Sequence, residues 1–431
     1  MITNLLAARS QMALSLGFHI IFASFSVVMP FLMCLAHYKW IKTKNPIYEK
    51  LRKAWLTMVG ILFIIGAVSG TILSFELGLL WPTFMKHAGP IIGMPFSLEG
   101  SFFMLEAIFL ALYIFGEKKL NQKLHFLSGL MVGITGLAAS TFVIGVNSWM
   151  NSPSGFDWVN NEAININPFK ALLNDAWFEQ SLHSALAMFQ ATSFALAGLH
   201  SFFLLKNPNK EIHKIALKII LPFAVITSLI QPISGDLSAK NIAENQPVKL
   251  AAMESHFHTQ RKAPIIIGGI PDTKNETVKY GLKIPGALSF LAFKDFNAEV
   301  KGLTEFPKED WPPVAIVHFA FQIMVGIGTM LALFSSLLIF LKWRKKNIFH
   351  KNILKALIIL TPAGFIALEA GWTVTEVGRQ PWIIHNILRT KDALTPVPGL
   401  TFHFLLFTTI YILLGIAVIW MIHTHFRKLN A

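Results

Sequence analysis

The sequence predicts an all-α integral membrane protein with about nine transmembrane helices, and three observations carry this prediction. Hydrophobic residues make up 54% of the 431 residues, charged residues make up only 14%, and the mean hydropathy is +0.55. A soluble domain contains about 25% charged residues, so a chain this apolar would expose large hydrophobic patches to water. The 37 Phe and 11 Trp suit a lipid-facing surface and its interfacial belts. The chain therefore needs lipid as its solvent.

Nine apolar stretches are each long enough to cross a bilayer, which requires roughly 20 helical residues. In chain order they cover residues 12–37, 54–80, 95–116, 124–147, 180–205, 214–234, 312–342, 353–377 and 399–425. The first stretch is too long for a cleaved signal peptide. A basic loop follows it, where a signal peptide would have a small-residue cleavage site.

The segments between the spans divide the chain into three parts. Most connections are short, but residues 235–311 are polar, with many charges and several Pro and Gly. We therefore assign transmembrane helices one to six to residues 1–234 and an extramembrane loop or small domain to 235–311. Helices seven to nine then occupy residues 312–431.

The distribution of positive charge predicts the orientation. The loops after spans one, three, five and seven, with the C-terminal tail, contain 21 Lys and Arg. The N-terminus and the short loops on the other side contain 6. Because cytoplasmic loops carry the excess of Lys and Arg, and loops beyond about 60 residues escape this rule, we expect the N-terminus and the long loop outside and the C-terminus in the cytoplasm. The net charge of +14 then reflects topology and anionic lipid, not nucleic acid.

The sequence also excludes several kinds of cofactor site. A single cysteine, Cys34, rules out internal disulfides, Cys-rich zinc sites, a four-Cys iron–sulfur cluster and haem attachment through CxxCH. His183 and His200 are 17 residues apart and face different sides of a helix, so they do not match the bis-histidine helix of quinol–cytochrome c reductases. The sequence also lacks the run of six histidines that a haem–copper oxidase needs.

Ionisable side chains at membrane depth are costly, so each is a candidate for function. They are His19, Glu99, Glu106, His183, His200, His318, Glu369, Glu376, Arg379 and His403. Spacing identifies no partner for His318 or His403. His19, about two turns into the first span, is either an axial ligand or a packing histidine.

Trp372, Glu376 and Arg379 form the first of three groups, at the outer end of the eighth span. Glu376 follows Trp372 by four residues and shares its helix face, and Arg379 lies one turn further on. A buried carboxylate needs a cation, a metal or a proton, and an arginine beside it suits an anionic group such as a haem propionate. The alternative is a helix end with an internal Glu–Arg pair and an interfacial tryptophan.

His183 in the fifth span and Met324 in the seventh form the second group, both in the outer halves of their spans. Imidazole and thioether are an axial pair for a low-spin haem and raise its potential. Because the chain has no CxxCH motif, such a haem would be b-type. Alternatively, Met324 fills space in an apolar helix and His183 bonds a neighbouring helix.

Glu99 and Glu106 in the third span form the third group. Seven residues are close to two helical turns, so both carboxyls lie on one stripe, about 10 Å apart along the axis. Carboxyls spaced in this way suit a proton relay, which Ser140 and Asn147 in the fourth span would extend. The alternative is a pair of protonated glutamic acids that bond neighbouring helices.

Together these residues resemble subunit I of the cytochrome bd-type quinol oxidases over nearly the whole chain. The most specific motif is Gly378-Arg379-Gln380-Pro381-Trp382, with Trp372 and Glu376 before it. The supporting residues are His19, His183, Met324 within Phe321-Gln322-Ile323-Met324, Gly235-Asp236, and the loop segment 246–254 (QPVKLAAME).

The resemblance implies three haems in this chain. His183 and Met324 would ligate haem b558. His19 and Glu376 would ligate the two high-spin haems, b595 and d (or a b-type haem in place of d), and members differ in which residue holds which haem. The residues that would lie beside the haems are Trp372, Arg379 and Arg9.

The resemblance also implies that Lys249 and Glu254 bind quinol and that Glu99 and Glu106 carry protons, with Glu99 also near a haem iron. On a helix, Lys249 and Glu254 diverge by about 140°, which argues against a local salt bridge. The alternative for this pair is a solvated charged helix. The partners implied are a second membrane subunit and a small single-span subunit.

Two positions depart from the family pattern. Seven residues separate Glu99 from Glu106, where one branch has a spacing of eight. Gln322 stands two residues before Met324, where many members have an arginine near haem b558. Without that charge the reduced haem is less favoured, unless another cation replaces it. The loop is of the short type, a trait that points to the cyanide-insensitive branch.

These placements predict a quinol:oxygen oxidoreductase of the bacterial cytoplasmic (inner) membrane. Quinol oxidation would release protons outside, and the Glu106–Glu99 stripe would supply cytoplasmic protons for reducing oxygen to water, so charge is separated without a pump. Two other functions remain open. A secondary transporter or proton channel would use similar buried groups, but the inverted-repeat pattern is not seen. The other is a haem-bearing assembly or sensory paralogue without turnover.

Overall fold

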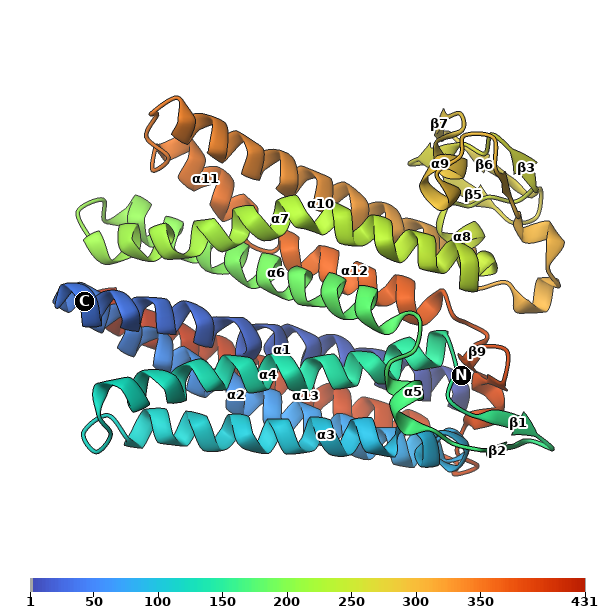
Figure 1. Cartoon of the computed structure of the whole chain (residues 1–431), viewed down its shortest axis with the longest axis horizontal. Coiled ribbons are helices and arrows are strands. Elements are labelled where there is room, and N and C mark those ends of the chain that lie inside the picture. Colours follow the sequence, from blue (N-terminus) through green and yellow to red (C-terminus); the bar gives the residue numbers. More distant parts are fainter. Residues whose placement is uncertain (1–2, 431) are drawn as a thin grey trace.

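The computed structural model describes residues 3–430, with side chains through Arg427, as a bundle of long helices (Figure 1). Within this range nine segments are long and apolar enough to cross a membrane, as predicted. They are α1 Asn4–Thr43, α2 Pro46–Leu80, α3 Pro82–Phe115, α4 Gln122–Asn151, α6 Trp177–Lys206, α7 Glu211–Asn245, α10 Val314–Trp343, α11 Lys351–Ile359 with α12 Ala363–Val377 as one span, and α13 Leu400–Asn430.

Capping side chains and prolines set several helix ends. The Asn45 side chain accepts a hydrogen bond from the Ile47 amide and Pro46 follows it, so α2 begins with two N-terminal signals. Asn121 caps α4 in the same way. Pro362 lies between α11 and α12, where its missing N–H interrupts the helical hydrogen bonds.

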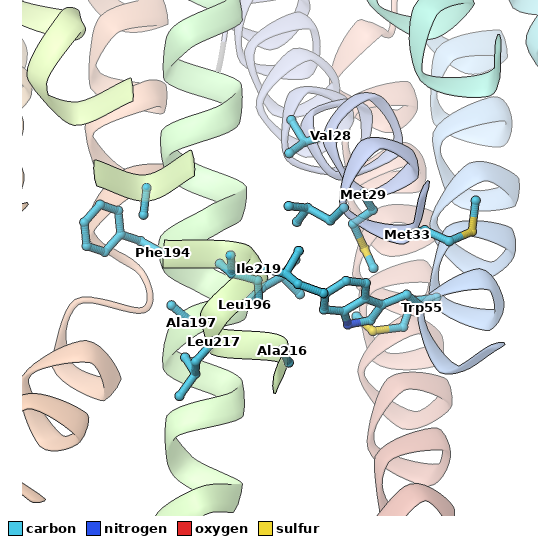
Figure 2. Close-up of a cluster of buried hydrophobic side chains, with 14 of the residues drawn as sticks. Val28, Met29, Met33, Trp55, Phe194, Leu196, Ala197, Ala216, Leu217 and Ile219 are labelled. Carbon is cyan, nitrogen blue, oxygen red and sulfur yellow. The ribbon is translucent and has the colours of Figure 1, made fainter. Parts of the chain in front are cut away.

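The helices form two groups that pack side by side (Figure 1). One group contains α1 to α4 with α13, and the other contains α6, α7 and α10 to α12. Buried apolar side chains fill the space between the groups. Figure 2 shows part of this core, including Val28, Met29 and Met33 of α1, Trp55 of α2, Phe194, Leu196 and Ala197 of α6, and Ala216, Leu217 and Ile219 of α7.

Large apolar side chains remain exposed along α10 and α13, among them Leu333, Phe340 and Ile416. A surface of this kind needs lipid or another membrane subunit against it. Because the sequence carries few charges in these helices, the exposure follows directly from the hydropathy pattern.

The N-terminus and the long loop lie at one end of the bundle, and the C-terminus lies at the other (Figure 1). We call these the loop end and the C-terminal end. Their separation agrees with the alternation of nine spans. That the C-terminal end faces the cytoplasm stays a prediction from the positive charges.

The long loop begins later than predicted. Residues 235–245, which we assigned to the loop because they are polar, continue α7 to Asn245. Their polar groups find partners: Asp236 accepts from Lys240 at 2.5 Å and from Lys294 at 2.7 Å, and the Ser238 hydroxyl donates to Glu179 of α6. Because these groups are paired, the helix extends past the apolar span.

The rest of the loop is a set of short elements. They are α8 Pro247–Met253, β3 Gln260–Arg261, β4 Ile265–Ile267, β5 Ile270–Asp272, β6 Thr277–Lys279, β7 Leu282–Ile284, α9 Ala287–Phe293, β8 Glu299–Val300 and two 3-10 turns at Leu303–Glu305 and Lys308–Asp310. The strands pair antiparallel as β3–β8, β4–β7 and β5–β6.

Two other connections at the loop end also contain structure. The connection from α4 to α6, expected only to be short, holds the hairpin β1 Asp157–Val159 and β2 Glu162–Ile164 and the short helix α5 Pro168–Leu172. The connection from α12 to α13 holds the pair β9 Trp382–Ile384 and β10 Leu388–Arg389, followed by a 3-10 turn at Thr390–Ala393.

Candidate functional site

Glu376 lies near the C-terminal end of α12, at the loop end of the bundle, with partners on both oxygens. Nη2 of Arg379 donates to its Oε2 at 2.7 Å, and the side-chain amide of Asn147 on α4 donates to its Oε1. The Arg379 side chain is 1% exposed, yet its Nε and Nη1 have no hydrogen-bond partner within residues 3–430. A buried guanidinium with unused donors suits an anionic group beside the carboxylate.

A line of hydrogen bonds connects Glu376 to the long loop. Lys249 on α8 donates through Nζ to Oδ1 of Asn151 at 2.9 Å, and the Asn151 amide donates to Oδ1 of Asn147 at 3.2 Å. Asn147 and Asn151 are four residues apart on α4, so they share one helix face. Gln246 adds a second contact by donating to the Asn151 carbonyl at 2.7 Å. The loop and the membrane site thus form one polar network.

Lys249 and Glu254 are both buried, at 3% and 1% exposure. Burial lowers the pKa of Lys249 to about 7, and the positive charge of Arg379 adds to this effect. Burial raises the pKa of Glu254 to about 8. Lys249 contacts α4, whereas the Glu254 carboxyl meets the backbone of Ile266 in β4, so the two side chains diverge. Neither side chain lies on a solvated helix surface.

His385 and Glu179 are neighbours of Lys249 that spacing in the sequence does not identify. Burial lowers the pKa of His385 to about 4, and the positive charges of Lys249 and Arg379 contribute to the shift. The negative charge of Glu179 raises the pKa of Lys249 and so opposes the effect of burial. Because these residues come from the segment after α12, from α6 and from α8, only the fold brings them together.

His19 and His183 share one local arrangement. Nδ1 of His19 lies 3.0 Å from the Ser69 hydroxyl, and Nδ1 of His183 lies 2.9 Å from the Ser234 hydroxyl. Each serine donates its only hydrogen to a backbone carbonyl of its own helix, at 2.9 and 2.8 Å. Each serine oxygen therefore accepts from Nδ1–H, which leaves Nε2 as the nitrogen with a free lone pair. Metal-binding histidines are commonly oriented in this way.

The Nε2 lone pair of His183 faces the Gln231 amide, which donates to it at 3.2 Å. His183 on α6 and Met324 on α10 lie on helices that both pack against α7 and α12. A Cβ added to Gly371 of α12 would lie 3.0 Å from Sδ of Met324, and one added to Gly70 would lie 2.9 Å from the His19 ring. A Cβ at either position would press on a candidate ligand, so glycine leaves room for both side chains.

The donor set fits haem. It contains two imidazoles whose Nε2 atoms carry the lone pair, with the Gln231 amide on that of His183, a thioether, and a carboxylate next to a buried arginine with two unused N–H groups. Trp372 packs against the main apolar core, one helical turn from Glu376. Arg9 lies half-buried in the second turn of α1, and within residues 3–430 it has no carboxylate partner.

Glu106 is buried at 5% exposure and faces α4, where a Cβ on Gly136 would lie 3.1 Å from its carboxyl carbon. Ser140, one turn beyond Gly136, donates to the Leu137 carbonyl at 2.7 Å. Asn147 lies on the same face two turns further and donates a hydrogen bond to Glu376. Along α4, Asn147 is about 16 Å from Gly136. The α4 stripe therefore leads from Glu106 to Glu376.

Glu99 lies half-buried on α3, two turns from Glu106 toward the loop end. Glu76 is a further buried carboxyl, at 2% exposure, that we did not single out. It accepts from Gln11 of α1 at 3.0 Å. Its presence in an apolar stretch is the same signal that identified Glu99 and Glu106. Glu369 of α12, a candidate from the sequence, lies against Gly17 of α1.

A second polar cluster lies at the C-terminal end and was also missed. The Tyr113 hydroxyl lies 3.0 Å from Nδ1 of His37, the Tyr113 ring stacks on His125, and Arg52 pairs with Glu117 at 2.6 Å. A cavity of about 240 Å³ is lined by His37, Trp40, Glu117, Leu120, Gln122 and His125. These residues come from α1, α2, α3, α4 and the loop between α3 and α4, so no single helix pattern reveals them.

Comparisons with known proteins give one result. The profile of the family described as cytochrome bd terminal oxidase subunit I matches residues 7–430. The bd oxidase structure from Geobacillus thermodenitrificans has a chain that is 35% identical, with 99% of each chain covered and a TM-score of 0.92. The cytochrome bd ubiquinol oxidase subunit 1 of Bacillus subtilis is 31% identical over 442 residues, which covers 99% of this chain and 94% of that one.

A second Bacillus subtilis chain, also named as a bd oxidase subunit I, is 34% identical over 432 residues. The alignment covers 97% of that chain and 99% of the present chain. The similarity is therefore spread over the whole membrane bundle and the long loop rather than confined to one motif.

Proposed function

Because the chain belongs to the cytochrome bd terminal oxidase subunit I family, we propose that it oxidises quinol at the loop end and reduces oxygen there with cytoplasmic protons. Membership makes it a multi-pass protein of the bacterial cytoplasmic membrane and the subunit I of a terminal quinol oxidase. It also implies haem cofactors, a subunit II, and quinol and oxygen as substrates.

One observation carries the proposal most directly. The hydrogen bonds from Lys249 through Asn151 and Asn147 to Glu376 join the loop to a buried carboxylate in the membrane. A quinol oxidase needs such a connection, because oxidation in the loop must be coupled to chemistry inside the bundle. A buried arginine with unfilled donors beside that carboxylate also suits a haem propionate.

We assign the haem ligands on the chemistry of the donors. His183 and Met324 would hold haem b558, and His19 and Glu376 would hold the two high-spin haems, b595 and d or a b-type haem in place of d. When bound, haem iron carries electrons and binds oxygen. The Ser69 and Ser234 hydroxyls keep Nε2 of the two histidines available, and Arg379 offers donors to a propionate.

We assign the quinol site to Lys249 and Glu254. Glu254 would accept a quinol proton, because its buried carboxyl has one oxygen without a partner. Lys249 would hold a quinol oxygen or shape the site from the α4 side. Two quinols and one oxygen then give two quinones and two waters.

The proton path would run from the C-terminal end through Glu106 and Glu99, with Ser140 and Asn147 as polar groups on α4. The buried carboxyl of Glu106 facing Gly136 supports this assignment. With protons taken up at one end and released at the other, the enzyme would be electrogenic without pumping. Besides subunit II, we expect a single-span small subunit against the exposed apolar helices.

An optical spectrum of the purified protein tests the proposal. Haem bands with low-spin and high-spin components are expected, and a protein without haem bands would return the chain to the transporter class. Oxygen consumption with quinol then separates an oxidase from a haem-bearing paralogue without turnover. Both measurements are needed because haem binding alone does not establish turnover.

Met324→Leu is expected to weaken the low-spin haem band or to lower its midpoint potential. Leucine keeps the volume of the side chain, so the free energy of unfolding should fall by less than about 1.5 kcal/mol. The substitution nevertheless removes the sulfur that favours the reduced iron. Redox-titrated spectra measure the effect. Met330→Leu, at an exposed position on the same helix, is the matched control. An unchanged spectrum and potential in Met324→Leu would remove Met324 from the ligands.

Glu254→Ala and Lys249→Ala are expected to raise the quinol KM or reduce the rate, with haem content intact. Loss of one hydrogen bond to a charged group costs about 1.5–3 kcal/mol, or about tenfold and more in KM. Activity with an artificial donor that bypasses the loop should survive. Lys283→Ala, at an exposed loop position, is the control. Equal loss with both donors would indicate a structural role for the loop.

The same assay has an expected pH dependence. Because burial raises the pKa of Glu254 to about 8, the carboxyl is protonated below this pH and accepts a proton only above it. The quinol kcat/KM should therefore rise as the pH increases toward about 8 and level off beyond it. Glu254→Ala should lose this dependence.

A further inference from the structure

The segment 266–268, at the end of β4, lies between Glu254 and α10. β4 pairs with β7 on one edge only, and the other edge carries backbone groups without a strand partner. An open edge of this kind needs other hydrogen-bonding groups to cover it. Two side chains of α10 and the Glu254 carboxyl provide them.

Gln322 takes the place of a missing strand on this edge. Its Nε2 donates to the Ile266 carbonyl at 2.9 Å, and its Oε1 accepts from the Gly268 amide at 3.0 Å. A neighbouring β-strand would bind the same two groups of residues i and i+2. An arginine here could donate to the carbonyl but could not accept from the amide. This pairing explains why glutamine suits position 322 in this chain.

His318 lies one turn before Gln322 on the same helix face and is fully buried. Its Nδ1 lies 2.9 Å from the Met253 carbonyl, and its Nε2 lies 3.1 Å from the Gly268 carbonyl. A carbonyl oxygen only accepts, and a neutral imidazole donates from one nitrogen only. In either tautomer the ring therefore donates to one of the two carbonyls and lies against the other.

The geometry also connects this contact to the quinol segment. Met253, whose carbonyl His318 contacts, directly precedes Glu254, and the Ile266 backbone that Gln322 holds is the group that meets the Glu254 carboxyl. Gly268 has φ of +67°, a left-handed conformation that glycine adopts without strain, and this turns both its N–H and its C=O toward α10.

We propose that His318 and Gln322 form a clamp that holds the segment 266–268 and the end of α8 against α10, and so positions Glu254 for quinol. The proposal rests on the assignment of Glu254 to the quinol site.

Hydrogen exchange of the intact oxidase, read by mass spectrometry on peptides that cover 264–270, tests the clamp. His318→Gln and Gln322→Met should each raise exchange in this segment, because each removes donors or acceptors from its backbone. The quinol KM should rise by about tenfold, the effect of leaving a buried polar group unpaired, with the bypass-donor rate unchanged. His403→Gln, at an exposed histidine of α13, is the matched control.

Unchanged exchange in both variants would overturn the clamp. Raised exchange with an unchanged quinol KM would leave the clamp in place and overturn the role of Glu254 in quinol binding.

Discussion

Glu376→Gln is expected to stop oxygen reduction and to leave the low-spin haem intact. Glutamine keeps the shape of the side chain but removes the negative charge that Arg379 pairs with at 2.7 Å, and it replaces one of the two acceptor oxygens with an NH2 group. The buried guanidinium then loses its ionic partner, and a buried unpaired charge is strongly unfavourable. Oxygen consumption should fall by about 100-fold, the upper end of the loss seen when a residue that supports a metal ligand is removed.

The two readouts are the high-spin bands of the reduced spectrum and the rate of oxygen consumption with quinol. Because His183 and Met324 lie on other helices, the low-spin band should persist. Glu162→Gln, an exposed carboxylate in the hairpin at the same end of the bundle, is the control. Normal turnover in Glu376→Gln would return this residue to the alternative of a helix end with an internal ion pair.

Glu106→Gln is expected to slow steady-state oxygen consumption while quinol still reduces the haems. The substitution keeps the size of the side chain next to Gly136 but removes a group that can take up and release a proton. A positioned proton-transfer group contributes about 10²–10⁴-fold to a rate, and the fall should lie in this range. Electron delivery does not use Glu106, so single-turnover reduction should be unaffected.

Oxygen consumption and membrane-potential generation in proteoliposomes measure this effect together. Glu211→Gln, an exposed carboxylate at the C-terminal end, serves as the control. If turnover and membrane potential both stay at wild-type levels in Glu106→Gln, the carboxyl stripe on α3 has a structural role only.

The sequence alone determined the number and order of the spans. Hydropathy is a local property, since each helix satisfies its own backbone and needs only about 20 apolar residues to cross the bilayer. It also identified the ionisable residues at membrane depth, because each is costly wherever it lies. Glu376, Arg379 and Glu106 were found in this way, without knowledge of their neighbours.

The tertiary structure decided what these residues contact. The path from Lys249 to Glu376 uses Asn147 and Asn151. The sequence placed Asn147 in a proton path but did not connect it to Glu376, and Asn151, which is polar but uncharged, gave no signal. Residues 235–245 are polar yet helical, because their polar groups pair within the helix, as Asp236 does with Lys240, and also with Glu179 of α6 and with Lys294 just after α9.

His318 is the clearest case of a residue whose partners the sequence did not reveal. Spacing gives it no partner, because both of its nitrogens lie against backbone carbonyls, one 65 and the other 50 residues away along the chain. Backbone groups are present at every residue and leave no mark in the sequence. Composition and periodicity therefore determine which segments enter the membrane and which side chains are costly there. Only the folded loop decides which carbonyls and amides meet those side chains.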